Sequence, residues 1–253
     1  MRKLLVAAAV APALLTALAA NAADLPVAPA PVPLYGPPLF SWTGFYVGGN
    51  VGGAWAQSNV TDTLFGLNFT NGDSNGRFIG GGEVGFNYQF NYLMVGVEGD
   101  FDWVAADNSA TGIATPAGVL TLASNNTWIS TLAARFGFVA DRALFYAKAG
   151  GGWVGNNGFT VTNTTTGAAI SGVNNNNTGG WLVGAGVEWA FAYSWTVKLE
   201  YDYLGLNSQS FTIPATAPVL AGDTLTTGNR SVQMLKLGVN YLFNWGGPTV
   251  ARY

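Results

Sequence analysis

The sequence contains no cysteine and no histidine among its 253 residues, and only 9% of its residues are charged. Without cysteine there can be no disulfides, iron–sulfur clusters or thiolate zinc sites. Without histidine there can be no Ser-His or Cys-His nucleophile pair, no His-ligated metal and no imidazole acid/base catalysis. Average proteins carry about 25% charged residues, so this chain has too few charges to cover a water-facing surface. Its ten basic residues are scattered, which argues against a nucleic-acid partner.

The two ends of the chain differ in composition from the rest. Residues 1–22 are typical of a cleaved secretory signal peptide, because Arg2 and Lys3 precede an apolar run that ends in a small-x-small site at 20–22. Residues 23–41 are rich in proline, which favours an extended periplasmic linker over a packed core. We therefore expect export, a barrel-forming region over residues 42–243, and a short tail at 244–253.

The overall hydropathy is positive, yet no run after residue 22 approaches the 18 or more apolar residues of a spanning helix. The apolar residues instead alternate with polar or small ones, which is the period of a β-strand with two different faces. This alternation predicts eight strands, at residues 42–55, 77–90, 92–103, 127–139, 143–154, 179–191, 194–206 and 230–243.

The connections between these strands alternate in length. Those at 91, 140–142 and 192–193 are short, whereas 56–76, 104–126, 155–178 and 207–229 are about twenty residues each and rich in Asn, Thr, Ser and Gly. An even number of antiparallel strands with short turns at one end and long loops at the other is typical of an outer-membrane barrel. The predicted fold class is all-β, an eight-stranded antiparallel up-and-down transmembrane β-barrel.

The charged residues of the strands share the face opposite the apolar row. This is clearest where acids recur at every second position, as in Glu98, Asp100 and Asp102. We predict an interior charge network that comprises Glu83, Glu98, Asp100, Asp102, Arg135, Lys148, Glu188, Lys198, Glu200, Asp202 and Lys236.

A soluble lipocalin-type barrel has the same alternation with its faces exchanged. Glycines pad the charged face, which suits the crowded inside of a narrow barrel better than a solvated exterior. Aromatic residues gather at the ends of the apolar rows, where membrane-interface girdles belong. The predicted girdle contains Trp55, Trp103, Trp128, Trp153, Trp181, Trp189 and Trp195. These features favour the membrane interpretation.

Two interpretations of the interior charges stay open. Seven acids and four bases can form an ion-pair network that plugs the barrel, because unpaired buried charges are costly. The excess of acids also allows a narrow cation-preferring pore, or a cation bound at Glu98, Asp100 and Asp102. A hydrolase with paired carboxylates is a weaker third interpretation, because no cleft-forming domain accompanies the acids. We predict no catalytic residue, no cofactor and no metal site.

The opening 40–49, FSWTGFYVGG, resembles the start of the porin-like immunogenic outer-membrane proteins of Gram-negative alphaproteobacteria, which are opacity-protein-like eight-stranded barrels. The close 236–243, KLGVNYLF, is similar to the terminal signal that the barrel assembly machinery recognises. The resemblance implies that Lys236, Gly238, Tyr241 and Phe243 form this signal, that the assembly machinery is a partner during biogenesis, and that the protein lies in the outer membrane. In the family the chain usually ends at the last aromatic residue, whereas this chain continues.

Three classes of function follow from these features. The first is a structural envelope protein that packs against outer-membrane lipid and lipopolysaccharide and whose loops 56–76, 104–126, 155–178 and 207–229 contact host or surface ligands. The second is a small porin for ions or very small solutes. The third is a barrel enzyme, but the familiar outer-membrane enzymes resemble one another in using a catalytic histidine, which this chain lacks. We therefore expect no enzyme, and a plugged structural barrel with the small porin as the alternative.

Overall fold

The computed structural model describes residues 40–62, 68–72, 76–106, 110–115, 118–173, 177–212, 222 and 224–244. The predicted signal peptide, nearly all of the Pro-rich linker and the tail after residue 244 lie outside these residues. The described part of the chain includes no helix long and apolar enough to cross a membrane. It consists of twelve strands joined by turns and short irregular segments.

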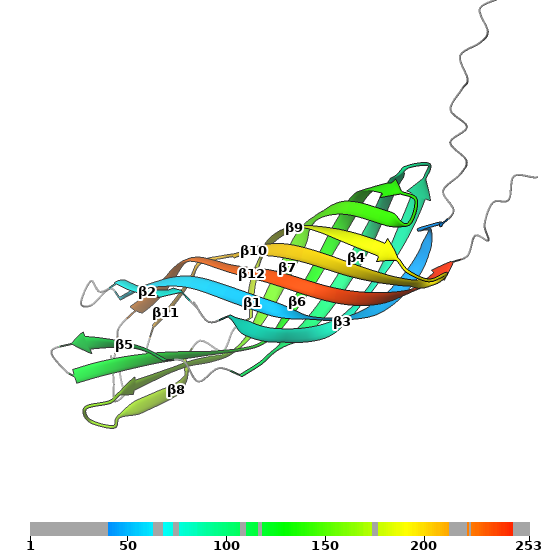
Figure 1. Ribbon diagram of the computed structural model, residues 1–253. Helices are drawn as coiled ribbons and strands as arrows, with labels where there is room; N and C mark the ends of the chain where they lie inside the picture. The colour runs from blue at the N-terminus through cyan, green and yellow to red at the C-terminus, as the bar shows by residue number, and fades with distance from the viewer. Residues whose placement is uncertain are drawn as a thin grey trace, which may run out of the picture. The chain divides into compact units, whose positions relative to one another are not determined.

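Eight long strands form a closed antiparallel barrel (Figure 1). Each pairs with its sequence neighbour in the barrel, and pairing of the first with the last closes the sheet. The fold class is therefore as predicted. The barrel strands are β1 (Gly44–Asp62), β3 (Arg77–Phe90), β4 (Leu93–Val104), β6 (Gly118–Ala140), β7 (Ala143–Asn163), β9 (Thr178–Ala190), β10 (Trp195–Leu206) and β12 (Thr224–Asn244).

Short turns join barrel strands at one end, as the sequence predicts. Asn91 and Asp141 begin two of them and have φ values of 57° and 53°. Asn and Asp tolerate this left-handed conformation better than most residues, and two-residue hairpins require it. The residue types in these turns therefore fix which barrel strands are neighbours.

The long connections differ from the prediction, because they contain strands rather than loops alone. At the end of the barrel opposite the short turns, β1, β6, β7 and β12 continue and pair with four further strands, β2 (Asn68–Gly72), β5 (Ala110–Thr115), β8 (Ala169–Val173) and β11 (Gln209–Thr212). Two four-stranded sheets result, in the orders β2-β1-β12-β11 and β5-β6-β7-β8 (Figure 1). Threonine is a good strand former, and 159–163, FTVTN, alternates apolar and polar residues, but the Asn, Ser and Gly residues around such short stretches favour the prediction of a loop.

The outer surface of the barrel is apolar. Its middle carries exposed aliphatic side chains such as Val47, Val97, Leu199 and Leu237, each between 49% and 55% exposed. Among the described barrel strands, no charged side chain with an assigned exposure lies on this face. Such a surface is unfavourable in water and suits the hydrocarbon core of a bilayer, where a closed barrel satisfies every strand hydrogen bond.

Aromatic side chains border this apolar band. Of the predicted girdle, Trp55, Trp103, Trp128, Trp153 and Trp181 lie near the sheet end of the barrel and Trp189 and Trp195 near the short turns; all are exposed except Trp128, which is half-buried against Phe101. From Phe45 to Trp55, β1 rises roughly 33 Å. With a strand tilt of about 40°, this gives roughly 25 Å across the membrane, the height of the apolar band in such barrels.

Candidate functional site

The eleven charged residues predicted for the interior all lie inside the barrel, each 3% exposed or less. They come from seven of the eight barrel strands, as Glu83 of β3, Glu98, Asp100 and Asp102 of β4, Arg135 of β6, Lys148 of β7, Glu188 of β9, Lys198, Glu200 and Asp202 of β10, and Lys236 of β12. Strand alternation points them inward, and closure of the barrel brings residues far apart in the sequence within contact distance.

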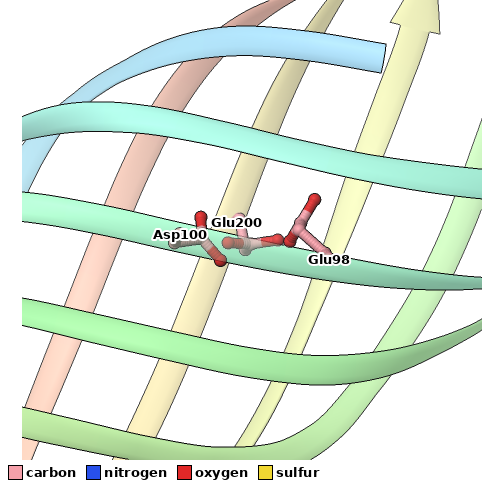
Figure 2. A group of neighbouring side chains, drawn as sticks. All are labelled: Glu98, Asp100 and Glu200. Atoms are coloured by element: carbon pink, nitrogen blue, oxygen red, sulfur yellow. The ribbon is translucent and has the colours of Figure 1, made fainter. Parts of the chain in front are cut away.

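Carboxylates from opposite walls meet at the centre of the network (Figure 2). Glu98 and Asp100 extend from β4, and Glu200 extends from β10, which lies four strands away around the barrel. One oxygen from each lies within 4.8 Å of the others. Such a cluster is stable only if cations neutralise it, because unpaired charges are very costly in a dry interior.

Three lysines supply that neutralisation. Lys148 Nζ lies 2.8 Å from Glu200, 3.1 Å from Glu98 and 3.4 Å from Asp100. Lys236 Nζ lies 3.1 Å from Asp100 and 3.0 Å from Glu200, and Lys198 Nζ lies 3.3 Å from Glu98 and 3.4 Å from Glu200. Each central carboxylate therefore contacts at least two ammonium groups.

The remaining acids pair around this centre. Asp202 lies 3.0 Å from Lys236 and 3.2 Å from Lys148, and Glu83 lies 2.6 Å from Lys198. Asp102 is the least tightly paired, at 3.9 Å from Lys236. The predicted grouping of Glu98 and Asp100 with Asp102 as a cation site is thus replaced by a grouping with Glu200, and lysine ammonium groups already contact these oxygens. A metal ion would have to displace them, so the geometry does not favour a metal site.

Arg135 links the network to two tyrosines. Its guanidinium lies 3.1 Å from Glu98 and 2.9 Å from Glu188, and its Cζ lies 5.4 Å and 3.9 Å from the ring centroids of Tyr46 and Tyr146. Both tyrosine hydroxyls donate to carboxylates at 2.7 Å, Tyr46 to Glu98 and Tyr146 to Glu200. Cation–π contact and ion pairing together hold the guanidinium in place.

Neutral side chains accommodate or extend the network. Thr131 donates to Asp100 at 2.9 Å, Thr196 to Glu188 at 2.5 Å, and the Asn240 amide to Glu188 at 3.0 Å. Gly186 leaves room for the tyrosine, since a Cβ there would lie 2.5 Å from the Tyr146 hydroxyl. The predicted inward glycines thus have a packing role beside bulky interior side chains.

An apolar cluster lies on each side of the charged centre. The cluster toward the sheet end consists of Ala54, Ile79, Ile129, Ala133, Val154, Leu182, Leu204, Leu206, Val232 and Met234. The cluster toward the short turns consists of Phe40, Trp42, Tyr46, Met94, Val139, Leu144, Tyr146, Ala190 and Leu242. The interior is therefore layered, with apolar, ionic and apolar zones in series along the barrel.

Trp42 corrects the predicted start of the first strand. The strand begins at Gly44, whose φ of 151° is rarely adopted by residues with a side chain. The Trp42 amide donates to Gln89 Oε1 at 2.8 Å, and the Trp42 indole is 1% exposed and packs edge-on against Phe40, with ring centroids 5.0 Å apart. The segment before β1 thus contributes to the interior instead of the wall.

The predicted interior network did not include Tyr46, Tyr146, Arg77 and Arg230. Tyr46 and Tyr146 donate hydrogen bonds to the network, as described above. Arg77 lies on the same inward face as Glu83 of its strand, and Arg230 on the same inward face as Lys236 of its strand. For three of them the sequence held a signal, because Tyr146, Arg77 and Arg230 each stand an even number of positions from a predicted charge on the same strand. The strand of Tyr46, β1, carries none of the predicted charges. The two arginines raise the basic residues on the inward face from four to six, which reduces the apparent acidic excess.

The predicted assembly-signal residues lie on the closing strand, β12. Lys236 and Gly238 face the interior, whereas Tyr241 and Phe243 are on the outer face near the short turns. The Tyr241 ring lies 5.1 Å from that of Trp195 and 4.9 Å from that of Phe243. Phe243 is exposed on this face and Tyr241 is half-buried.

Known proteins resemble the chain along nearly its whole length. The sequence pattern of the family described as "Outer membrane protein beta-barrel domain" matches residues 10–243. The chain is 28% identical over 236 residues to the 31 kDa outer-membrane immunogenic protein of Brucella melitensis biotype 1. The matched region covers 90% of this chain and 95% of that protein. It is 27% identical over 240 residues to the 25 kDa outer-membrane immunogenic protein of Brucella canis. This match covers 94% of this chain and 96% of that protein. The solved structure of OprG from Pseudomonas aeruginosa matches 81% of this chain and 99% of that chain, with 12% identity and a TM-score of 0.44.

Proposed function

Since the chain belongs to the outer membrane protein beta-barrel family, we propose that it is a sealed structural barrel that anchors a polar surface structure in the outer membrane. One observation carries the proposal: side chains from opposite walls contact one another across the interior, as Lys198 of β10 does with Glu98 of β4, and an apolar cluster flanks them on each side. An ion would have to cross two apolar zones and break the central ion pairs. The resulting barrier opposes both an ion pore and a small-solute porin.

The two polar sheets support a surface-contact role. In one of them, hydrogen bonds between side chains join β11 to β12, as in the Ser210 to Thr226 and Thr212 to Thr224 pairs at 3.0 Å and 2.9 Å. Binding functions often reside on segments that a rigid scaffold presents. Relatives named as immunogenic proteins are consistent with such exposure. We propose that the connections at 56–76, 104–126, 155–178 and 207–229 contact host or surface ligands.

The other proposed partners follow from the outer face. Its apolar band and aromatic borders would pack against outer-membrane lipid and lipopolysaccharide, and thereby support envelope integrity. The assembly machinery would recognise Tyr241 and Phe243 during insertion. We propose no catalytic activity, because the chain lacks histidine and the paired carboxylates are neutralised by lysines deep inside the barrel.

Planar-bilayer recording tests whether the barrel is sealed. The folded protein should insert without producing reproducible single-channel steps, with a known porin as the positive control for insertion. If steps occur, Lys148→Gln should change their size or ion selectivity only when the current passes through the interior. Arg142→Gln, in an exposed turn, serves as the matched control. Steps that respond to Lys148→Gln and not to Arg142→Gln would show that the protein is a pore.

A further inference from the structure

Three buried hydrogen-bond donors lie on the inward face just beyond the apolar cluster at the sheet end. Arg77 and Arg230 stand two residues beyond Ile79 and Val232, which are both members of that cluster. Thr178 pairs with Val154, another member. The three donors therefore lie at a similar height inside the opening of the barrel at its sheet end, which we call the mouth. The apolar cluster separates them from the central carboxylates.

These donors lack acceptors. Arg230 is 8% exposed and Thr178 is 1% exposed, whereas Arg77 is half-buried as a residue, with its Nε and Nη2 atoms buried. Among the described residues, Arg77 Nε and Nη2, Arg230 Nη1 and Thr178 Oγ1 are buried and have no hydrogen-bond partner. Ion pairs involve Arg135 and the three lysines, and neither mouth arginine has one within the described part of the chain. Buried donors normally have acceptors, and unpaired buried cations are costly.

The positions of the arginines allow both to reach one ligand. Arg77 lies on β3 and Arg230 on β12, the two strands that flank β1. Arg77 pairs with Ala54 of β1 and Arg230 pairs with Ser58, so two strand spacings and a stagger of four residues separate their Cα atoms by roughly 16 Å. Both side chains are long and lie on the inward face, which lets their guanidinium groups approach one another inside the barrel. Guanidinium groups present several N–H donors in a fixed plane that matches the oxygens of phosphate or sulfate, and a threonine hydroxyl adds a donor without a charge.

We propose that Arg77, Arg230 and Thr178 form a binding site for a tetrahedral oxyanion, phosphate or sulfate, at the mouth of the barrel below the two surface sheets. The oxyanion can come from solution or from a phosphate of lipopolysaccharide, and the chemistry of the site is the same for both. The site does not depend on a conducting interior, because it lies on the outer side of the apolar cluster.

Calorimetric titration with inorganic phosphate tests the site. The protein is purified from outer membranes in detergent, and ionic strength is held constant with chloride. We expect binding to weaken at least about tenfold in Arg77→Gln and in Arg230→Gln, because each loses a charge-assisted hydrogen bond. Thr178→Val should weaken it by a few fold. Arg142→Gln, which removes the same charge from an exposed turn at the other end, should leave the affinity unchanged.

Two further arms complete the test. Resistance of each unheated variant to unfolding in SDS shows that the barrel has formed. Repeating the titration in bilayer discs with and without lipopolysaccharide identifies the source, since weaker phosphate binding in its presence means that the lipid phosphate occupies the site. No binding by the unaltered protein, or equal affinity in the Arg77, Arg230 and Arg142 variants, would overturn the proposal.

Discussion

Replacing Lys236 by methionine should destabilise the barrel by about 3–5 kcal/mol, the usual cost of removing one partner from a buried ion pair. Lys236 is fully buried, and its ammonium lies 3.0 to 3.1 Å from Asp100, Glu200 and Asp202. Methionine has a similar length, so the loss would come from the missing positive charge and not from a cavity. Asp102 would lose the one ion pair that it has among the described residues. Asp100, Glu200 and Asp202 would each lose one of their cation contacts. Reversible urea unfolding in lipid vesicles, followed by tryptophan fluorescence, measures the free energy of unfolding.

A second substitution separates charge from packing in this experiment. Asp202→Asn removes one of the negative charges that lose a cation contact in Lys236→Met, so the double variant should recover at least about 1 kcal/mol relative to the sum of the single variants. Arg142→Gln, on the exposed turn, should change the stability by less than about 0.5 kcal/mol. A loss below about 1 kcal/mol in Lys236→Met would mean that water solvates the interior, contrary to a sealed barrel.

Replacing Trp42 by alanine should also cost about 3–5 kcal/mol, the usual range for removing a large buried aromatic side chain. The indole packs against Phe40 inside the barrel near the short turns, and its removal leaves a cavity that neighbouring side chains fill only in part. The same unfolding measurement applies.

Trp103→Ala is the matched control for this variant. Trp103 is 64% exposed on the outer face, where lipid can fill the space that the indole leaves. Trp103→Ala should therefore lower the free energy of unfolding clearly less than Trp42→Ala does. Equal losses in the two variants would show that Trp42 is not an interior packing residue.

The interior face was predictable from strand alternation alone. Acids at Glu98, Asp100 and Asp102 can share a face only if the chain is extended, and the same parity rule places Lys198, Glu200 and Asp202 together. Closure of the barrel was also predictable, because exposed strand edges are not tolerated in hydrocarbon. Both predictions depend on local sequence and on a general property of bilayers.

The contacts inside the barrel were not predictable in the same way. Whether Lys148 meets Glu98 or Glu200 depends on strand tilt and on the register around the whole sheet, which no single strand encodes. The surface sheets escaped detection for another reason. Their alternating stretches, such as 159–163, FTVTN, are short and lie among loop-forming Asn, Ser and Gly residues. Pairing of these segments becomes favourable because the barrel already holds β1 beside β12 and β6 beside β7.

Spin labels on single cysteines test the central claim, that the apolar face contacts lipid and the charged face is enclosed. The cysteine-free sequence allows labels to be placed cleanly at Val197, Leu199, Leu237 and Val239 on the outer face. In lipid vesicles these labels should collide readily with molecular oxygen, which concentrates in hydrocarbon, and rarely with a water-soluble nickel chelate. Ready collision with the nickel chelate at these four positions would contradict the account and show that water covers this face.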